Sequence, residues 1–176
     1  MSPGNSYFKE SVIRWLTKVV TDRFESFRIM IPDHPAEYTY RAKGQRNPTG
    51  KALAQWNAIR NRIERVLGKQ GQEEFTLNWK EQINTHPAYR RSVKEVLRLC
   101  RNNTAFKDAL EMSTKEVLQW WDIQKEISQK NTDIWVKFLI CELAFLSAAK
   151  EILGSDVTYV YHRPWPIFHD FMSGKF

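Results

Sequence analysis

The sequence has little cysteine and no apolar run long enough to cross a membrane. Two cysteines, Cys100 and Cys141, occur among 176 residues, too few for a disulfide framework or a zinc cluster, so we expect two buried thiols. The most apolar stretch, 134–149, contains Lys137 and Glu142 and is shorter than the ~20 residues of a membrane helix. The N-terminus also lacks the basic start and apolar core of a signal peptide. These absences predict a cytoplasmic protein that does not enter a membrane.

Several catalytic motifs are absent as well. No glycine-rich phosphate loop follows an expected strand, no HExxH or paired histidine–carboxylate spacing offers metal ligands, and no GxSxG elbow occurs. We therefore expect no metal ion. A generic nucleotide-binding α/β enzyme, one alternative for the function, lacks the loop that would hold its phosphates.

The chain does contain many aromatic side chains. Seven Trp, ten Phe and six Tyr residues, within a composition that is 42% hydrophobic, supply more apolar surface than a disordered chain carries. The length fits one domain, and no repeat or linker divides the chain. We expect a single domain over residues 1–176.

Apolar spacing predicts alternating helices and short strands. The expected helices cover 7–20, 51–69, 87–101, 104–129 and 133–154, and the expected strands cover 27–31, 38–40, 75–79 and 157–161. Gly68 is a plausible end for the second helix, and Ser113, which begins a capping-box sequence, is a candidate break in the fourth. This alternation predicts an α/β fold with a parallel sheet flanked by helices.

The net charge of +7 is confined to one segment. Residues 41–70 contain eight basic residues and one acidic residue, whereas basic and acidic residues balance in both 1–40 and 71–176. On a helical wheel, four of these cations form one stripe: Lys51, Arg62, Arg65 and Lys69. Such a stripe can follow a phosphate backbone. The alternative is that these cations only flank a buried helix face.

Two further places could carry chemistry. Glu142 lies within an apolar helix, one turn after Phe138 on the same face, so its carboxylate is either functional or paired with a basic side chain. Tyr161 and His162 end an expected strand, where open α/β sheets place ligand-binding residues. A single histidine is more often an ordinary structural residue, and that alternative stays open.

Three ordered motifs resemble the tRNA-dependent cyclodipeptide synthases. They are Ser-Pro-Gly-Asn-Ser-Tyr-Phe at 2–8, Ile-Met-Ile-Pro-Asp with Tyr-Thr-Tyr-Arg-Ala-Lys-Gly at 29–44, and Glu-Leu-Ala-Phe at 142–145 with Val-Tyr-His-Arg-Pro-Trp-Pro at 160–166. The combination of Asn5, Tyr161 and His162 resembles the subfamily defined by Asn, Tyr and His. The resemblance covers essentially the whole chain.

The resemblance implies a Rossmann-like domain similar to the catalytic domain of class I tyrosyl- and tryptophanyl-tRNA synthetases. Because the family uses amino acids already attached to tRNA, it implies no ATP site and no cofactor, and the synthetases' ATP-binding motifs are indeed absent here. It implies an aminoacyltransferase that joins two aminoacyl groups into a diketopiperazine. The expected partners are aminoacyl-tRNAs, and we expect a monomer.

The resemblance also implies roles for individual residues. Ser2 would be the nucleophile that carries the aminoacyl and then the dipeptidyl group, and Glu142 would hold the amino group. The other implied site residues are Asn5, which supports the serine loop, Gly4 and Phe138 in substrate positioning, and Tyr161 with His162 in positioning and proton transfer. The stripe of Lys51, Arg62, Arg65 and Lys69 would meet the acceptor stem of the first tRNA.

This chain departs from the family pattern in three ways, of which the changes at Phe138 and before the catalytic serine favour an alternative, whereas Ala144 continues a helix better than proline does. Phe138 replaces a tyrosine whose hydroxyl helps to hold the amine, Ala144 replaces a proline, and the strand that precedes the catalytic serine in relatives is missing from this chain. A terminus is a poor place to hold catalytic geometry. The alternative is therefore a catalytically impaired relative that binds tRNA acceptor stems.

Overall fold

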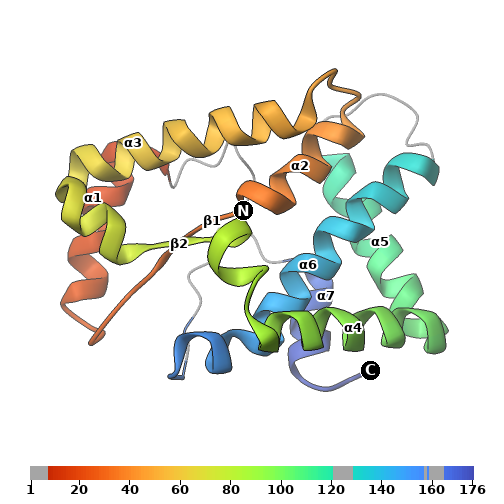
Figure 1. Cartoon of the computed structure of the whole chain (residues 1–176). Coiled ribbons are helices and arrows are strands. Elements are labelled where there is room, and N and C mark those ends of the chain that lie inside the picture. The colour runs from red at the N-terminus through yellow and green to blue at the C-terminus, as the bar shows by residue number, and fades with distance from the viewer. Residues whose placement is uncertain (1–7, 121–128, 157, 159–164) are drawn as a thin grey trace.

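The protein is mainly helical and contains a small parallel sheet (Figure 1). The structure, a computed structural model, describes residues 8–120, 129–156, 158 and 165–176. In chain order its elements are α1 (Glu10–Thr21), β1 (Ile29–Ile31), α2 (Asp33–Ala42), α3 (Pro48–Phe75), β2 (Thr76–Asn78), the π-helix η2 (Trp79–Ile83), α4 (Pro87–Asn102), α5 (Thr104–Trp120), α6 (Gln129–Leu153) and α7 (Pro166–Met172).

Helix α6 forms the centre of the larger hydrophobic core. Its sequence is apolar on nearly all sides, and a helix of that kind must be covered on all sides to be stable in water. Helices α2, α4, α5 and α7 pack around it, and Figure 1 shows α6 passing between them. Leu139, Leu143 and Ala149 of α6 are fully buried. The expected helix 133–154 is therefore present as α6, which the structure describes from Gln129 to Leu153.

Strands β1 and β2 pair in parallel, with Met30 opposite Leu77. Each strand has three residues, too few for a pair of strands to be stable alone. Asp33, the first residue of α2, reinforces the pair because its Oδ1 accepts hydrogen bonds from the backbone N–H groups of Trp79 (3.1 Å) and Lys80 (3.3 Å). The expected parallel sheet is confirmed, and within the described residues it has two strands.

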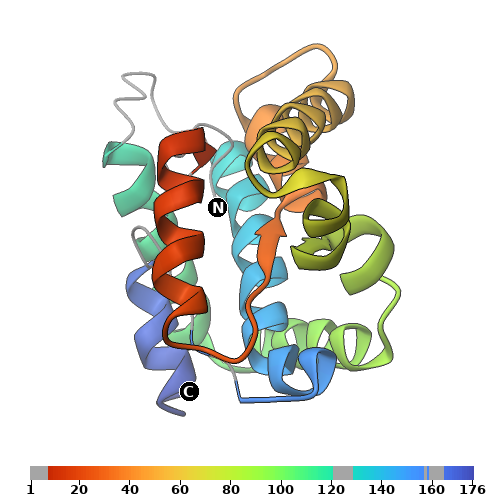
Figure 2. The same ribbon diagram turned by 90° about the vertical axis from the view of Figure 1, so that its left-hand side faces the viewer.

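Helix α1 lies against α3 and β1 over a second, smaller core (Figure 2). The buried members of this core come from before α1, from α1, from β1 and from α3: Phe8, Ile13, Ile31, Ile59 and Ile63. This core fixes the chain that follows the N-terminal motif against the charged helix. The geometry of α3 is therefore coupled to that of the first described residues.

The expectation of a strand at 38–40 was wrong, because Tyr38, Thr39 and Tyr40 lie in α2. The acidic side chain of Asp33 lies in the first turn, at the positive end of the helix dipole, and this placement stabilises the helix. Thr39 is buried and Tyr38 packs against the larger core. Tertiary packing thus overrides the β propensity of these side chains.

Two expectations about helix ends also change. Gly68 does break α3, with φ 76° and ψ 169°, but the helix resumes and continues to Phe75. Ser113 does not interrupt α5; its Oγ instead accepts a hydrogen bond from the backbone N–H of Ile167 (3.2 Å) at the start of α7. The expected strand 157–161 lies outside the described residues except for Thr158.

None of the described helices, α6 included, combines the length and the apolar character needed to cross a membrane.

Candidate functional site

The carboxylate of Glu142 lies inside the larger core. Its residue is 2% exposed, midway along α6. The indole Nε1–H of Trp165, the residue before α7, donates a hydrogen bond of 3.0 Å to Glu142 Oε2. A buried carboxylate without hydrogen bonds would cost several kcal/mol, on the order of its desolvation penalty. Trp165 therefore helps to accommodate the Glu142 carboxyl group at a position where the rest of the helix is apolar.

Aromatic rings border this carboxylate. The ring of Phe138, one turn before Glu142, lies 5.9 Å from that of Trp165 and 5.7 Å from that of Trp135. The Trp135 and Trp165 rings are 6.3 Å apart, and all three residues are buried. The prediction that Phe138 and Glu142 share a face is confirmed, because both contact Trp165. The site combines one anionic group with a rigid apolar wall.

The neighbouring thiol lies among phenol groups. Burial raises the pKa of Cys141 to about 11, and it also raises the pKa of Tyr89, whose hydroxyl accepts a hydrogen bond from Trp79 Nε1 (3.3 Å). Cys100 on α4 also has a raised pKa, again because of burial. Both cysteines are half-buried thiols rather than fully buried ones. A thiol with so high a pKa is a poor nucleophile at neutral pH.

The predicted basic stripe of α3 is engaged by other parts of the protein. Arg65 forms an ion pair of 2.7 Å with Glu10 of α1, and Arg62 donates to the backbone carbonyl of Phe8 (3.4 Å). Lys51 donates to the side chain of Gln45 (2.6 Å). These contacts support the alternative in which the cations only flank a buried helix face, although three of the four remain exposed.

Lys69 lies beyond the break at Gly68, so it does not belong to the same straight helical segment as Lys51, Arg62 and Arg65. It nevertheless borders the same shallow, open hollow as Arg65, together with Asn61 and Glu64. The structure therefore brings Arg65 and Lys69 together.

Five predicted site residues lie outside the described residues: Ser2, Gly4, Asn5, Tyr161 and His162. The described residues that border these segments include Phe8, which is buried, and Trp165, which donates a hydrogen bond to Glu142. Trp165 is the site residue that we did not predict. The motif Pro-Trp-Pro was visible in the sequence, but a contact over 23 positions is not encoded in any local pattern.

Within the described ranges, no group of three or more histidine, cysteine, aspartate or glutamate side chains is arranged to hold a metal ion.

Comparison with known proteins identifies the family. The family model for cyclodipeptide synthase matches residues 1–176. The cyclo(L-leucyl-L-leucyl) synthase of Bacillus subtilis (strain 168) is 27% identical over 186 residues, covering 100% of this chain and 74% of that protein.

Solved structures of cyclodipeptide synthases share the fold. The enzyme from Bacillus thermoamylovorans superposes with a TM-score of 0.84 at 21% identity, over 100% of this chain and 80% of that chain. AlbC from Streptomyces noursei gives a TM-score of 0.71 at 19% identity, over 88% of this chain and 76% of that chain. The chain thus belongs to the cyclodipeptide synthase family, whose enzymes form cyclic dipeptides from aminoacyl-tRNAs.

Proposed function

We propose that this protein makes a cyclic dipeptide by ping-pong catalysis through Ser2, with Glu142 as the group that binds the substrate amine. The observation that carries the proposal is the buried Glu142 carboxylate, which accepts a hydrogen bond from Trp165, whose ring packs with those of Phe138 and Trp135. In low dielectric a carboxylate binds an ammonium group strongly, and it can accept the proton that the amine loses when it attacks.

The first half-reaction loads the enzyme. The Ser2 hydroxyl attacks the ester carbonyl of the first aminoacyl-tRNA, the bond to the ribose oxygen breaks, and the free tRNA leaves with the serine proton. The product is an aminoacyl ester on Ser2. Asn5 supports the loop that presents Ser2, and Gly4 helps to position the substrate, as the motif of the family implies. Covalent catalysis of this kind divides one difficult transfer into two easier ones.

The second half-reaction builds and closes the ring. The amino group on the aminoacyl-Ser2 ester attacks the ester carbonyl of the second aminoacyl-tRNA and displaces that tRNA, while Glu142 takes the amine proton and passes it to the departing ribose oxygen. The new terminal amine then attacks the Ser2 ester, releasing the cyclic dipeptide and regenerating the hydroxyl. Tyr161 and His162 position the dipeptidyl group and assist proton transfer.

The wall formed by Trp135, Phe138 and Trp165 favours an apolar aminoacyl group. Phe138 has no hydroxyl to share in binding the amine, so that task falls more heavily on Glu142. The fold proposed for the site is the Rossmann-like domain of class I tyrosyl- and tryptophanyl-tRNA synthetases, adapted to substrates that are already activated. The parallel β1–β2 pair supports this relationship.

Mass spectrometry of the medium of an expressing host tests the proposal and identifies the product. We expect a diketopiperazine that disappears in Ser2→Ala and falls by at least about 100-fold in Glu142→Gln, because the amide cannot accept a proton. The Gln oxygen still accepts the Trp165 hydrogen bond, so the fold is retained.

Glu111→Gln on α5, which removes one negative charge elsewhere, is the control and should retain full activity. Wild-type protein that binds tRNA but neither forms an acyl-serine nor releases a cyclic dipeptide would instead be the impaired relative described above.

A further inference from the structure

Helix α4 presents a second basic face, away from α3. Its 16 residues contain five cations and a single acidic residue, Glu95. At 100° per residue the cations lie within an arc of about 100°, and they span about 16 Å along the axis. These cations are Arg90, Arg91, Lys94, Arg98 and Arg101, and all five are exposed.

The opposite face of α4 is fixed to the core. Tyr89, Ser92 and Val96 are buried, and the hydroxyls of Ser92 and Ser147 on α6 are 2.5 Å apart. Arg91 at the edge of the basic face makes an ion pair of 2.6 Å with Glu151 of α6. The charged face is therefore displayed on a rigid helix.

Within the described ranges, the centre of this face has no anionic partner in an ion pair. Lys94 and Arg98 form no ion pair with any residue that the structure describes, and Arg90 and Arg101 donate only to backbone carbonyls, those of Asn84 and Leu97. Arg90, Lys94 and Arg98 follow one another at intervals of four residues, where like charges repel and destabilise a helix. An anion bound along this row would relieve that repulsion.

We propose that the exposed face of α4 is a second docking surface for tRNA, which contacts phosphates of the RNA backbone. This inference rests on the proposed use of aminoacyl-tRNA substrates. Four of the five cations are arginines, whose planar guanidinium groups bind phosphate oxygens in pairs. A linear row of cations also matches the regular spacing of charges along a nucleic-acid strand.

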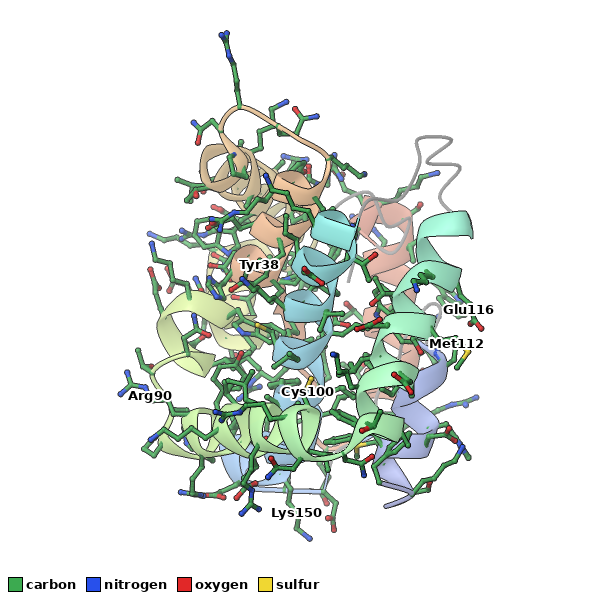
Figure 3. All side chains as sticks on the ribbon, turned by 90° about the vertical axis from the view of Figure 1, so that its right-hand side faces the viewer. Tyr38, Arg90, Cys100, Met112, Glu116 and Lys150 are labelled. Atoms are coloured by element: carbon green, nitrogen blue, oxygen red, sulfur yellow. The ribbon has the colours of Figure 1, made fainter. Side chains whose placement is uncertain are left out.

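The surface is separate from the predicted stripe of α3. Figure 1 shows α3 and α4 at opposite ends of the molecule, with α6 between them. Figure 3 shows Arg90 at the outer edge of the protein, pointing away from the core. A membrane surface fits the face less well, because Leu97, 40% exposed, is the only large apolar side chain that α4 displays to solvent.

Equilibrium binding of bulk tRNA, measured over a range of salt concentrations, tests the inference. The Ser2→Ala background is used so that acyl transfer cannot contribute. At low salt, Lys94→Gln with Arg98→Gln should weaken binding about tenfold. It should also reduce the slope of log K against log salt by about 1.4 to 1.8, as expected for the loss of two phosphate contacts.

The matched control is Lys18→Gln with Arg23→Gln, which removes two exposed cations near the C-terminal end of α1. We expect that variant to keep both its affinity and its slope. Equal losses in the two double variants would overturn the inference, because general charge would then explain the binding. Unchanged binding in the α4 variant would overturn it as well.

Two further measurements distinguish an RNA surface from a membrane surface, and the second surface from the proposed catalysis. Binding to anionic lipid vesicles that is lost in the α4 variant, without an effect on tRNA, would replace the RNA surface by a membrane surface. Cyclic dipeptide formation by the wild type is measured in parallel. If the wild type is active and the α4 variant binds tRNA normally, the second surface alone is refuted. If the wild type is inactive but its tRNA binding depends on α4, the proposed catalysis alone is refuted.

Discussion

Helices α3 and α4 both carry basic faces, but their cations have different surroundings. On α3, Arg62 and Arg65 contact Phe8 and Glu10, so they join the helix to the start of the described chain. On α4, Lys94 and Arg98 face solvent without an ion-pair partner among the described residues. A cation that already holds an internal partner must break that contact before it can bind a phosphate, whereas an unpaired cation has no such cost.

The comparison shows what a segmental charge count misses. Residues 71–176 sum to zero, yet α4 within them has a net charge of +4, from five cations and one acid. Acidic residues on other elements cancel this charge in the sum but not on the surface. A helical wheel drawn over 87–102 would have revealed the second face from sequence.

The largest expected effect comes from removing both faces together. Lys51→Gln with Lys69→Gln neutralises α3 without disturbing the contacts of Arg62 and Arg65. Each double variant should weaken tRNA binding about tenfold, and the quadruple variant with Lys94→Gln and Arg98→Gln about 100-fold, because distant sites add in free energy. Titration of tRNA at constant salt checks this. A quadruple variant no weaker than the α4 pair would show that α3 does not contribute.

The next prediction concerns the break in α3. Gly68 has φ 76° and ψ 169°, a conformation that is essentially restricted to glycine, and an added Cβ would meet no atom within 4 Å. Gly68→Ala should therefore cost about 1–3 kcal/mol through backbone strain alone. Urea unfolding measures this cost. Gln70→Ala, two residues later and exposed, should stay within about 0.5 kcal/mol of the wild type.

A smaller effect tests whether Glu10 competes with RNA for Arg65. Glu10→Gln removes the ion pair, and we expect tRNA affinity at low salt to increase about threefold as Arg65 becomes available to a phosphate. Glu25→Gln makes the same change in net charge at an exposed position between α1 and β1. If both variants tighten binding equally, the gain reflects net charge and Arg65 has no specific part in it.

The smallest expected effect is a gain in stability. Lys94→Gln removes repulsion with Arg90 and Arg98, so the free energy of unfolding without RNA should rise by about 0.3–0.5 kcal/mol, since glutamine and lysine have similar helix propensities. Urea unfolding of the RNA-free protein measures it, with Lys18→Gln as the control. A loss of stability would mean that Lys94 makes a favourable contact that outweighs its repulsion with Arg90 and Arg98.

The sequence predicted the features that depend on local periodicity. The apolar character of α6 and the position of Glu142 on the same face as Phe138 could be predicted from residue spacing alone. The parallel sheet was predicted from the alternation of helices and short strands. Tyr38–Tyr40 was misassigned because β-prone side chains also fill a core when they lie on a helix. Ser113 was misassigned because its hydroxyl meets α7, an element that we did not predict.

The remaining features depend on contacts between distant residues. The hydrogen bond between Trp165 and Glu142 joins residues 23 positions apart, and the ion pair of Arg65 with Glu10 joins residues 55 positions apart. Many side chains could form a hydrogen bond with a buried carboxylate or an ion pair with an exposed guanidinium. The partner is determined only by which residues the folded chain brings together.

The short sheet also has a mechanical consequence. Strands β1 and β2, with Asp33 bonded to Trp79 and Lys80, close a loop that contains the whole of α2 and α3. A segment held at both ends has less freedom than one attached at a single hinge, so we expect a movement of α3 relative to α6 to strain the β1–β2 pair. If a bound tRNA displaces α3, the hydrogen bonds between β1 and β2 should therefore weaken. We expect the backbone amide protons of the two strands to exchange faster with solvent when tRNA is bound.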